Sequence, residues 1–76
     1  MDALEILETL CKKNKSEGTF PYFSTTLEID RYLSENKLGT LKEFLDQIRP
    51  LCNQKKVIFG ETANYIYFNL KEYEHY

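Results

Sequence analysis

Apolar residues recur at helical spacing in three segments of the chain. The clearest pattern falls in residues 40–53, where apolar side chains follow the i, i+3, i+4, i+7 rule. These positions are Leu41, Phe44, Leu45, Ile48, Leu51 and Cys52. Shorter stripes occupy residues 2–15 and 25–36. The pattern predicts three amphipathic helices that turn their apolar faces toward one core.

Each predicted helix has a start signal. A residue able to cap the helix is followed three positions later by a glutamate, which is the spacing of a capping box. The three pairs are Asp2 and Glu5, Thr25 and Glu28, and Thr40 and Glu43. Pro50 interrupts the third segment, so we expect either a kink or a break near Arg49 with a further turn to about Asn53.

The last third of the chain alternates in the manner of strands. Residues 57–59 and 65–70 are rich in β-branched and aromatic side chains, and residues 60–64 connect them. In the second strand, Ile66, Phe68 and Leu70 should face the core. Residues 19–23 should form a short edge strand or a packed connector, because Pro21 excludes a helix there. Residues 71–76 show no clear pattern and should fray or cover a neighbouring subunit.

The order helix, short strand, helix, turn, helix, hairpin resembles the winged helix-turn-helix superfamily of small bacterial, archaeal and phage regulators. The residues that carry the resemblance are the helix start at Gly39-Thr40, the apolar face that follows it, and residues 55–59 with their returning strand. The resemblance implies an α+β fold of three helices and a C-terminal β-hairpin wing, in one domain over residues 1–76. It also implies that residues 40–53 form a recognition helix for the DNA major groove.

A DNA-binding transcriptional regulator would use three groups of side chains. The recognition helix would offer Thr40, Lys42, Glu43, Gln47, Arg49 and Asn53. Phosphate contacts would come from Ser24, Thr25, Lys37, Lys55 and Lys56, and the wing tip would present Thr62 and Asn64. Residues 37–56 hold five basic and two acidic side chains, a net charge of +3, which leaves −5 for the rest of the chain.

The overall charge favours a different partner. The chain has a net charge of −2 and a pI of about 5.3, whereas nucleic-acid binders usually carry a basic excess. The alternative is a winged helix that binds a protein, such as a small phage- or plasmid-type effector directed at a host protein. Tyrosine is enriched at protein interfaces. The candidate tyrosines are Tyr22, Tyr65, Tyr67, Tyr73 and Tyr76.

Catalysis and cofactor binding find little support in the residue types. The single histidine is His75, and two isolated cysteines, Cys11 and Cys52, lack the spacing of a structural zinc site. We therefore expect no enzyme activity, no metal and no cofactor. Both thiols should be buried in a cytoplasmic protein, since the sequence has neither a secretory signal pattern nor a membrane span. The small core and the half-site habit of helix-turn-helix proteins predict a homodimer.

Overall fold

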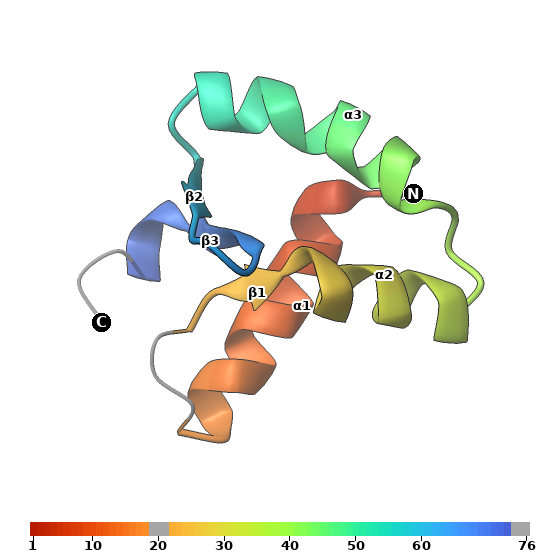
Figure 1. The fold of residues 1–76 in the computed structure, drawn as a ribbon, viewed down its shortest axis with the longest axis horizontal. Coiled ribbons are helices and arrows are strands. Elements are labelled where there is room, and N and C mark those ends of the chain that lie inside the picture. The colour runs from red at the N-terminus through yellow and green to blue at the C-terminus, as the bar shows by residue number, and fades with distance from the viewer. Residues whose placement is uncertain (19–21, 74–76) are drawn as a thin grey trace.

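The computed structural model describes residues 1–18 and 22–73, and it has an α+β fold in which three helices pack on a three-stranded antiparallel sheet (Figure 1). The helices are α1 (Ala3–Ser16), α2 (Thr26–Glu35) and α3 (Leu41–Asn53). The strands are β1 (Ser24–Thr25), β2 (Val57–Glu61) and β3 (Ile66–Leu70), and a 3-10 turn, η1 (Lys71–Tyr73), follows β3.

All three predicted helix starts are confirmed. At Asp2, Thr25 and Thr40 the side-chain oxygen accepts a hydrogen bond from the backbone N–H three residues later, over 3.1–3.2 Å. Only the third start forms the reciprocal capping box, with Glu43 accepting from the Thr40 backbone. Each cap satisfies a helix N–H that has no partner within the helix.

Helix α3 passes through Pro50 without a break. It is one helix from Leu41 to Asn53, so the interruption that the sequence left open near Arg49 does not occur. A proline at this position removes one hydrogen bond from the helix. Phe44 and Ile48, on the turns before Pro50, are buried in the core, and this packing holds the helix in place despite the missing bond.

The C-terminal strand lies in the middle of the sheet. The strand order is β1-β3-β2, with Ser24 opposite Phe68 and Val57 opposite Leu70. The predicted hairpin is confirmed, although β2 extends two residues further than expected. A short strand forms at Ser24–Thr25, immediately after the segment 19–23 in which one was expected. Residues 22–23 are not part of it, and residues 19–21 lie outside the described part of the chain.

The core lies between the sheet and the helices. Its fully buried large side chains include Leu7, Ile29, Leu33, Phe44 and Ile48. The Phe44 and Phe68 rings meet edge to face at 6.0 Å, which joins α3 to the central strand. Cys11 is fully buried as predicted, whereas Cys52 is only half-buried.

Burial along β3 and after it differs from the alternating pattern. Ile66 was expected in the core but is 38% exposed, because it lies at the hairpin end, beyond the buried positions Phe68 and Leu70. Asn69 was expected on the wetter face but is buried. Its amide donates to the Tyr73 carbonyl of η1 at 3.5 Å. Residues 71–73 are thus an ordered turn instead of a frayed tail, and 74–76 lie outside the described residues.

Candidate functional site

An apolar groove separates α3 from the β2–β3 hairpin. Its volume is about 370 Å³. The groove is lined by Thr26, Leu45, Ile48, Arg49, Cys52, Asn53, Phe59, Ile66 and Phe68. We call this feature the α3–hairpin groove. Its lining draws on α3 and both strands of the hairpin, which are the same elements that the sequence predicted as the contact face.

The groove stays open because burial falls along the hairpin. Helix α3 ends at Asn53, and Lys55 adopts a left-handed conformation with φ of +61° that turns the chain into β2. Val57, at the start of β2, is buried, but Phe59 is 53% exposed. On β3, Ile66 lies opposite Glu61, two residues before Phe68, the residue that faces Phe59, and Ile66 is 38% exposed. Large apolar side chains are therefore held at the surface beside α3.

The rim of the groove on the α3 side is polar. Arg49 and Asn53 are exposed and line its edge. Within residues 1–18 and 22–73, the guanidinium group of Arg49 forms no hydrogen bond or ion pair. A guanidinium beside an apolar hollow suits a ligand that combines an apolar group with a carboxylate.

Half of the side chains predicted to read DNA bases have structural partners. Thr40 and Glu43 bond each other in the cap of α3, with 3.2 Å between the Thr40 hydroxyl and the carboxylate. Gln47 accepts a hydrogen bond from the Ala3 N–H at 3.0 Å, which ties α3 to the start of α1. All six residues are exposed, and within the described residues no hydrogen bond or ion pair engages the other three side chains, namely those of Lys42, Arg49 and Asn53.

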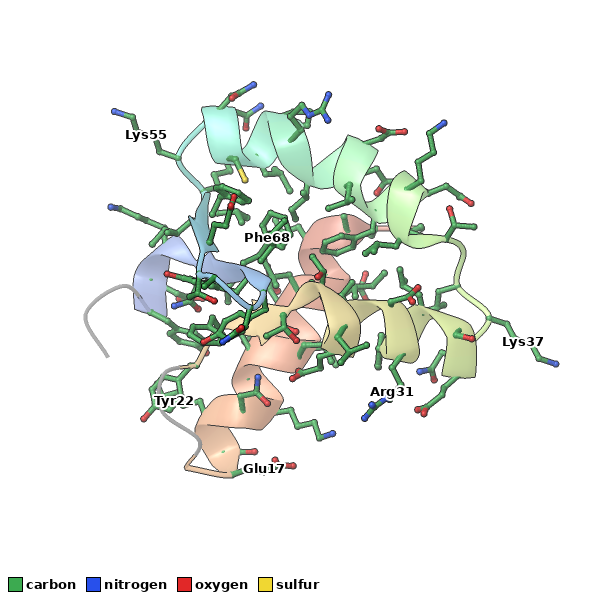
Figure 2. All side chains as sticks on the ribbon, in the orientation of Figure 1. Glu17, Tyr22, Arg31, Lys37, Lys55 and Phe68 are labelled. Carbon is green, nitrogen blue, oxygen red and sulfur yellow. The ribbon has the colours of Figure 1, made fainter. Side chains whose placement is uncertain are left out.

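The predicted phosphate contacts are not gathered in one place. Ser24 is fully buried, and its hydroxyl donates to Glu28 at 3.1 Å, so it cannot reach a phosphate. Thr25 is half-buried and caps α2. Lys37 and Lys55 are exposed but project from opposite sides of the molecule (Figure 2). Lys56, beside Lys55, is also exposed.

Ser24 belongs to a buried polar cluster that the sequence did not reveal. The Glu28 carboxylate accepts from Ser24 and from the Asn14 amide, which also donates to the Phe23 carbonyl at 2.9 Å. The Glu28 carboxylate therefore binds two side chains from other elements and does not complete a capping box with the Thr25 backbone. The cluster joins α1, β1 and α2, and it has a structural role.

The hairpin tip was located correctly, and Thr62 organises it. The Thr62 hydroxyl accepts from the N–H groups of Asn64 and Tyr65, each at 3.2 Å, and the Thr62 N–H donates to the Tyr65 carbonyl at 2.8 Å. Thr62 and Asn64 are both exposed. They remain available for a partner, but the Thr62 hydroxyl also shapes the turn.

The tyrosines divide into two groups instead of one patch. Tyr22 packs edge to face on Tyr73 at 6.1 Å. Tyr65 and Tyr67 gather with Phe23, whose ring stacks on that of Tyr67 at 4.3 Å. Tyr76 lies outside the described residues. These contacts bury part of each ring, and Tyr65 remains 39% exposed.

The two cysteine thiols do not belong to a metal-binding cluster within the described residues. No group of three or more histidine, cysteine, aspartate or glutamate side chains in residues 1–18 and 22–73 is arranged to hold a metal ion. Burial raises the pKa of the Cys11 thiol to about 11, and burial also raises the pKa of Cys52. Both thiols are therefore weak nucleophiles at neutral pH.

The chain was compared with known proteins in three ways. Neither the protein-family models, nor the curated proteins, nor the solved structures contain a match to it. Among the described helices, none has the length and apolar character that crossing a bilayer requires. The function of the chain is therefore inferred from the geometry of α3 and the hairpin.

Proposed function

We propose that this protein is a non-catalytic binding module of the winged-helix type, and that it holds a segment of a protein partner in the α3–hairpin groove. The observation that carries the proposal is the pair of large apolar side chains held open in the groove, Phe59 and Ile66. The exposed part of these side chains does not stabilise the isolated fold. Covering it on binding would contribute about 25 cal/mol of binding free energy per Å² of apolar surface.

Size and charge define the kind of segment that fits. A volume of about 370 Å³ lies at the lower end of the range of roughly 300–1,000 Å³ for ligand pockets, so the groove accommodates one or two bulky side chains. Arg49 at the rim favours a carboxylate on the same segment. The partner we propose is a short protein segment with an aromatic or aliphatic anchor and an acidic residue next to it.

The polar groups of α3 also support a protein partner over DNA. The N-terminal half of a recognition helix normally faces the bases. Here Thr40 and Glu43 bond each other in the helix cap, and Asp46 adds a second negative charge to the same half. Those carboxylates repel phosphate, and the net charge of −2 adds to this effect.

The test uses a small probe that mimics the proposed anchor. N-acetyl-phenylalanine carries a ring and a carboxylate, and N-acetyl-phenylalaninamide carries the ring alone. Titrated into ¹⁵N-labelled protein, the acid should shift the amide resonances of residues lining the groove and should bind more tightly than the amide. Arg49→Gln should abolish the difference between the two probes, because it removes the charge that favours the carboxylate.

Two further variants separate the groove from the rest of the surface. Ile66→Ser should weaken the binding of both probes, since it removes apolar lining from a position that is 38% exposed. Leu27→Ser is the matched control, because Leu27 is 68% exposed and does not line the groove. Equal effects of these two substitutions, or no shifts in groove residues, would contradict the proposal.

DNA binding through α3 is the second candidate, and one observation favours it. Lys42, Arg49, Lys55 and Lys56 are all exposed on α3 and the turn into β2. A regulator of this kind would lose orders of magnitude in affinity for generic duplex DNA between about 50 and 200 mM salt. Fluorescence anisotropy with a labelled duplex measures this dependence.

The matched variants for DNA are double substitutions. Lys42→Ala with Arg49→Ala should abolish salt-sensitive binding if α3 reads DNA, while Lys12→Ala with Lys13→Ala on the exposed side of α1 should have much less effect. Tight, salt-sensitive binding that depends on the α3 pair would replace the protein-binding proposal. No binding at about 50 mM salt would exclude duplex DNA as the ligand under these conditions.

A further inference from the structure

Strand β2 presents a free edge. The strand order β1-β3-β2 places β3 on one side of β2, and no strand of the described chain lies on the other side (Figure 1). Edge strands of monomeric proteins are commonly protected by proline, by several charges or by a bulge. The five residues of β2 contain no proline, and Glu61 is the only charge among them. The edge is therefore open to pairing with another strand.

The register identifies which backbone groups point outward. The Lys71 N–H donates to the Lys56 carbonyl, and the Thr62 N–H donates to the Tyr65 carbonyl. Both are directly opposed pairs in the same register, and hydrogen-bonded pairs alternate with non-bonded pairs along an antiparallel ladder. Even-numbered residues of β2 therefore bond β3. The N–H and C=O groups of Val57, Phe59 and Glu61 point to the free edge.

We propose that a second copy of this chain occupies this edge, with the two β2 strands pairing antiparallel about a twofold axis at Phe59. In this register Phe59 exchanges both backbone bonds with its copy, and Val57 does so with Glu61 of the other copy. Every outward backbone group of the strand is then satisfied. The two three-stranded sheets become one continuous sheet.

The sequence of β2 complements itself in this arrangement. The antiparallel register brings the end that follows Lys55 and Lys56 beside the end that carries Glu61 of the other copy. Opposite charges thus meet at both ends of the pair. The symmetry repeats each favourable contact twice, as an isologous interface requires.

The side chains supply an apolar contact at the axis. Phe59 and Phe68 already form a ring pair at 5.8 Å, and Phe68 meets Phe44 at 6.0 Å. This row of rings runs from the buried core to the exposed edge. Adding the second Phe59 at the axis extends the row across the interface and covers a ring that is otherwise 53% exposed.

The first test separates backbone pairing from side-chain contact. Phe59→Pro removes the N–H that crosses the axis but leaves the bonds of β2 to β3, since residue 59 does not donate to β3. Phe59→Thr removes the ring and keeps the N–H. Sedimentation equilibrium should show a dimer for the natural chain, and the proline variant should weaken it at least about tenfold more than the threonine variant.

The second test detects the register and does not depend on the proline variant folding. Directly opposed hydrogen-bonded residues have Cα atoms about 5.5 Å apart, which is within disulfide range. In a Cys52→Ser background, Phe59→Cys should therefore form a covalent dimer under mild oxidation. Glu61→Cys is the control, because two copies of Glu61 would lie more than about 13 Å apart.

Each result has a defined meaning. A covalent dimer from position 59 but not 61, together with the larger loss for Phe59→Pro, supports the proposal. A monomer at about 0.5 mM, equal effects of proline and threonine, or equal cross-linking at both positions overturns it. Failure here leaves the groove proposal intact, since that test depends on Ile66 and Arg49, which take no part in the strand pairing.

Discussion

Replacing Gly60 with alanine tests how the hairpin is packed. Gly60 lies directly opposite Tyr67 in the β2–β3 ladder. A Cβ atom at Gly60 would overlap Cζ and the hydroxyl of Tyr67, so the ring of Tyr67 covers the glycine. The absence of a side chain at position 60 is therefore what allows the ring to lie across the strand.

The size of the effect follows from what the displaced ring loses. The Tyr67 ring is stacked on Phe23 at 4.3 Å, with 26° between the planes, and an aromatic pair of this kind is worth about 0.5–1.5 kcal/mol. Inserting a methyl group into a filled site costs about 1–3 kcal/mol in total. Alanine regains about 0.5–1 kcal/mol over glycine in a strand. The difference is a net loss of about 0–2.5 kcal/mol in the free energy of unfolding, with a central value of about 1 kcal/mol.

A double-mutant cycle measures this value by urea unfolding. Gly60→Ala should destabilise the natural chain, but in a Tyr67→Ala background it should be neutral or stabilising, because no ring then covers position 60. The reasoning is refuted if Gly60→Ala costs the same in both backgrounds within about 0.5 kcal/mol. That result would mean that Tyr67 does not rest on Gly60 in solution.

Three further predictions concern α3 and the core. Ile48→Asp buries an unpaired carboxylate at a position that is 2% exposed, so we expect no cooperative thermal transition, and a melt near that of the natural chain would contradict the packing of α3. Gln47→Ala should lower the free energy of unfolding, measured in urea, by about 0.5–1.5 kcal/mol, because the Ala3 N–H loses its acceptor. Gln47→Glu keeps an acceptor and should lower it less. Equal losses from the two variants would show that this hydrogen bond does not stabilise the fold. Burial raises the pKa of the Cys11 thiol from 9.0 to about 11 in the folded chain. The unfolded thiol therefore releases its proton at lower pH than the folded one. Its contribution to stability is complete below pH 9 and should decline as pH rises from 9 to 11. Urea unfolding at a series of pH values should show this decline, and Cys11→Ala should reduce it. If the unfolding free energy changed equally with pH in both proteins, the decline would not arise from Cys11.

Local signals along the chain predicted most of the secondary structure. Capping side chains and apolar spacing located all three helices, because both act over a single helical turn. The hairpin was likewise evident from two β-rich segments around a polar turn. The elements of the candidate site, α3 and the hairpin, were therefore predictable.

The roles of individual side chains depended on contacts between distant segments. Gln47 bonds Ala3, which is 44 positions away in the sequence, so its structural use carries no local signal. In the sequence Ser24 has the character of a surface residue. In the structure it is buried, because its hydroxyl donates to Glu28, which also accepts from Asn14. Ile66 fits an alternating strand, and its exposure depends on how far the helices cover the hairpin.

The central place of β3 has a consequence for the way the chain acquires its structure. Strands β1 and β2 do not pair with each other, and each is completed only by β3. Ser24 and its partner Phe68 are separated by 44 positions, so the sheet depends on long-range pairing, which forms slowly. During synthesis the helices emerge well before residues 66–70, yet they have no sheet to pack on. We therefore expect the domain to fold in one late step, after β3 has left the ribosome, with the helical segments exposed to chaperones until then.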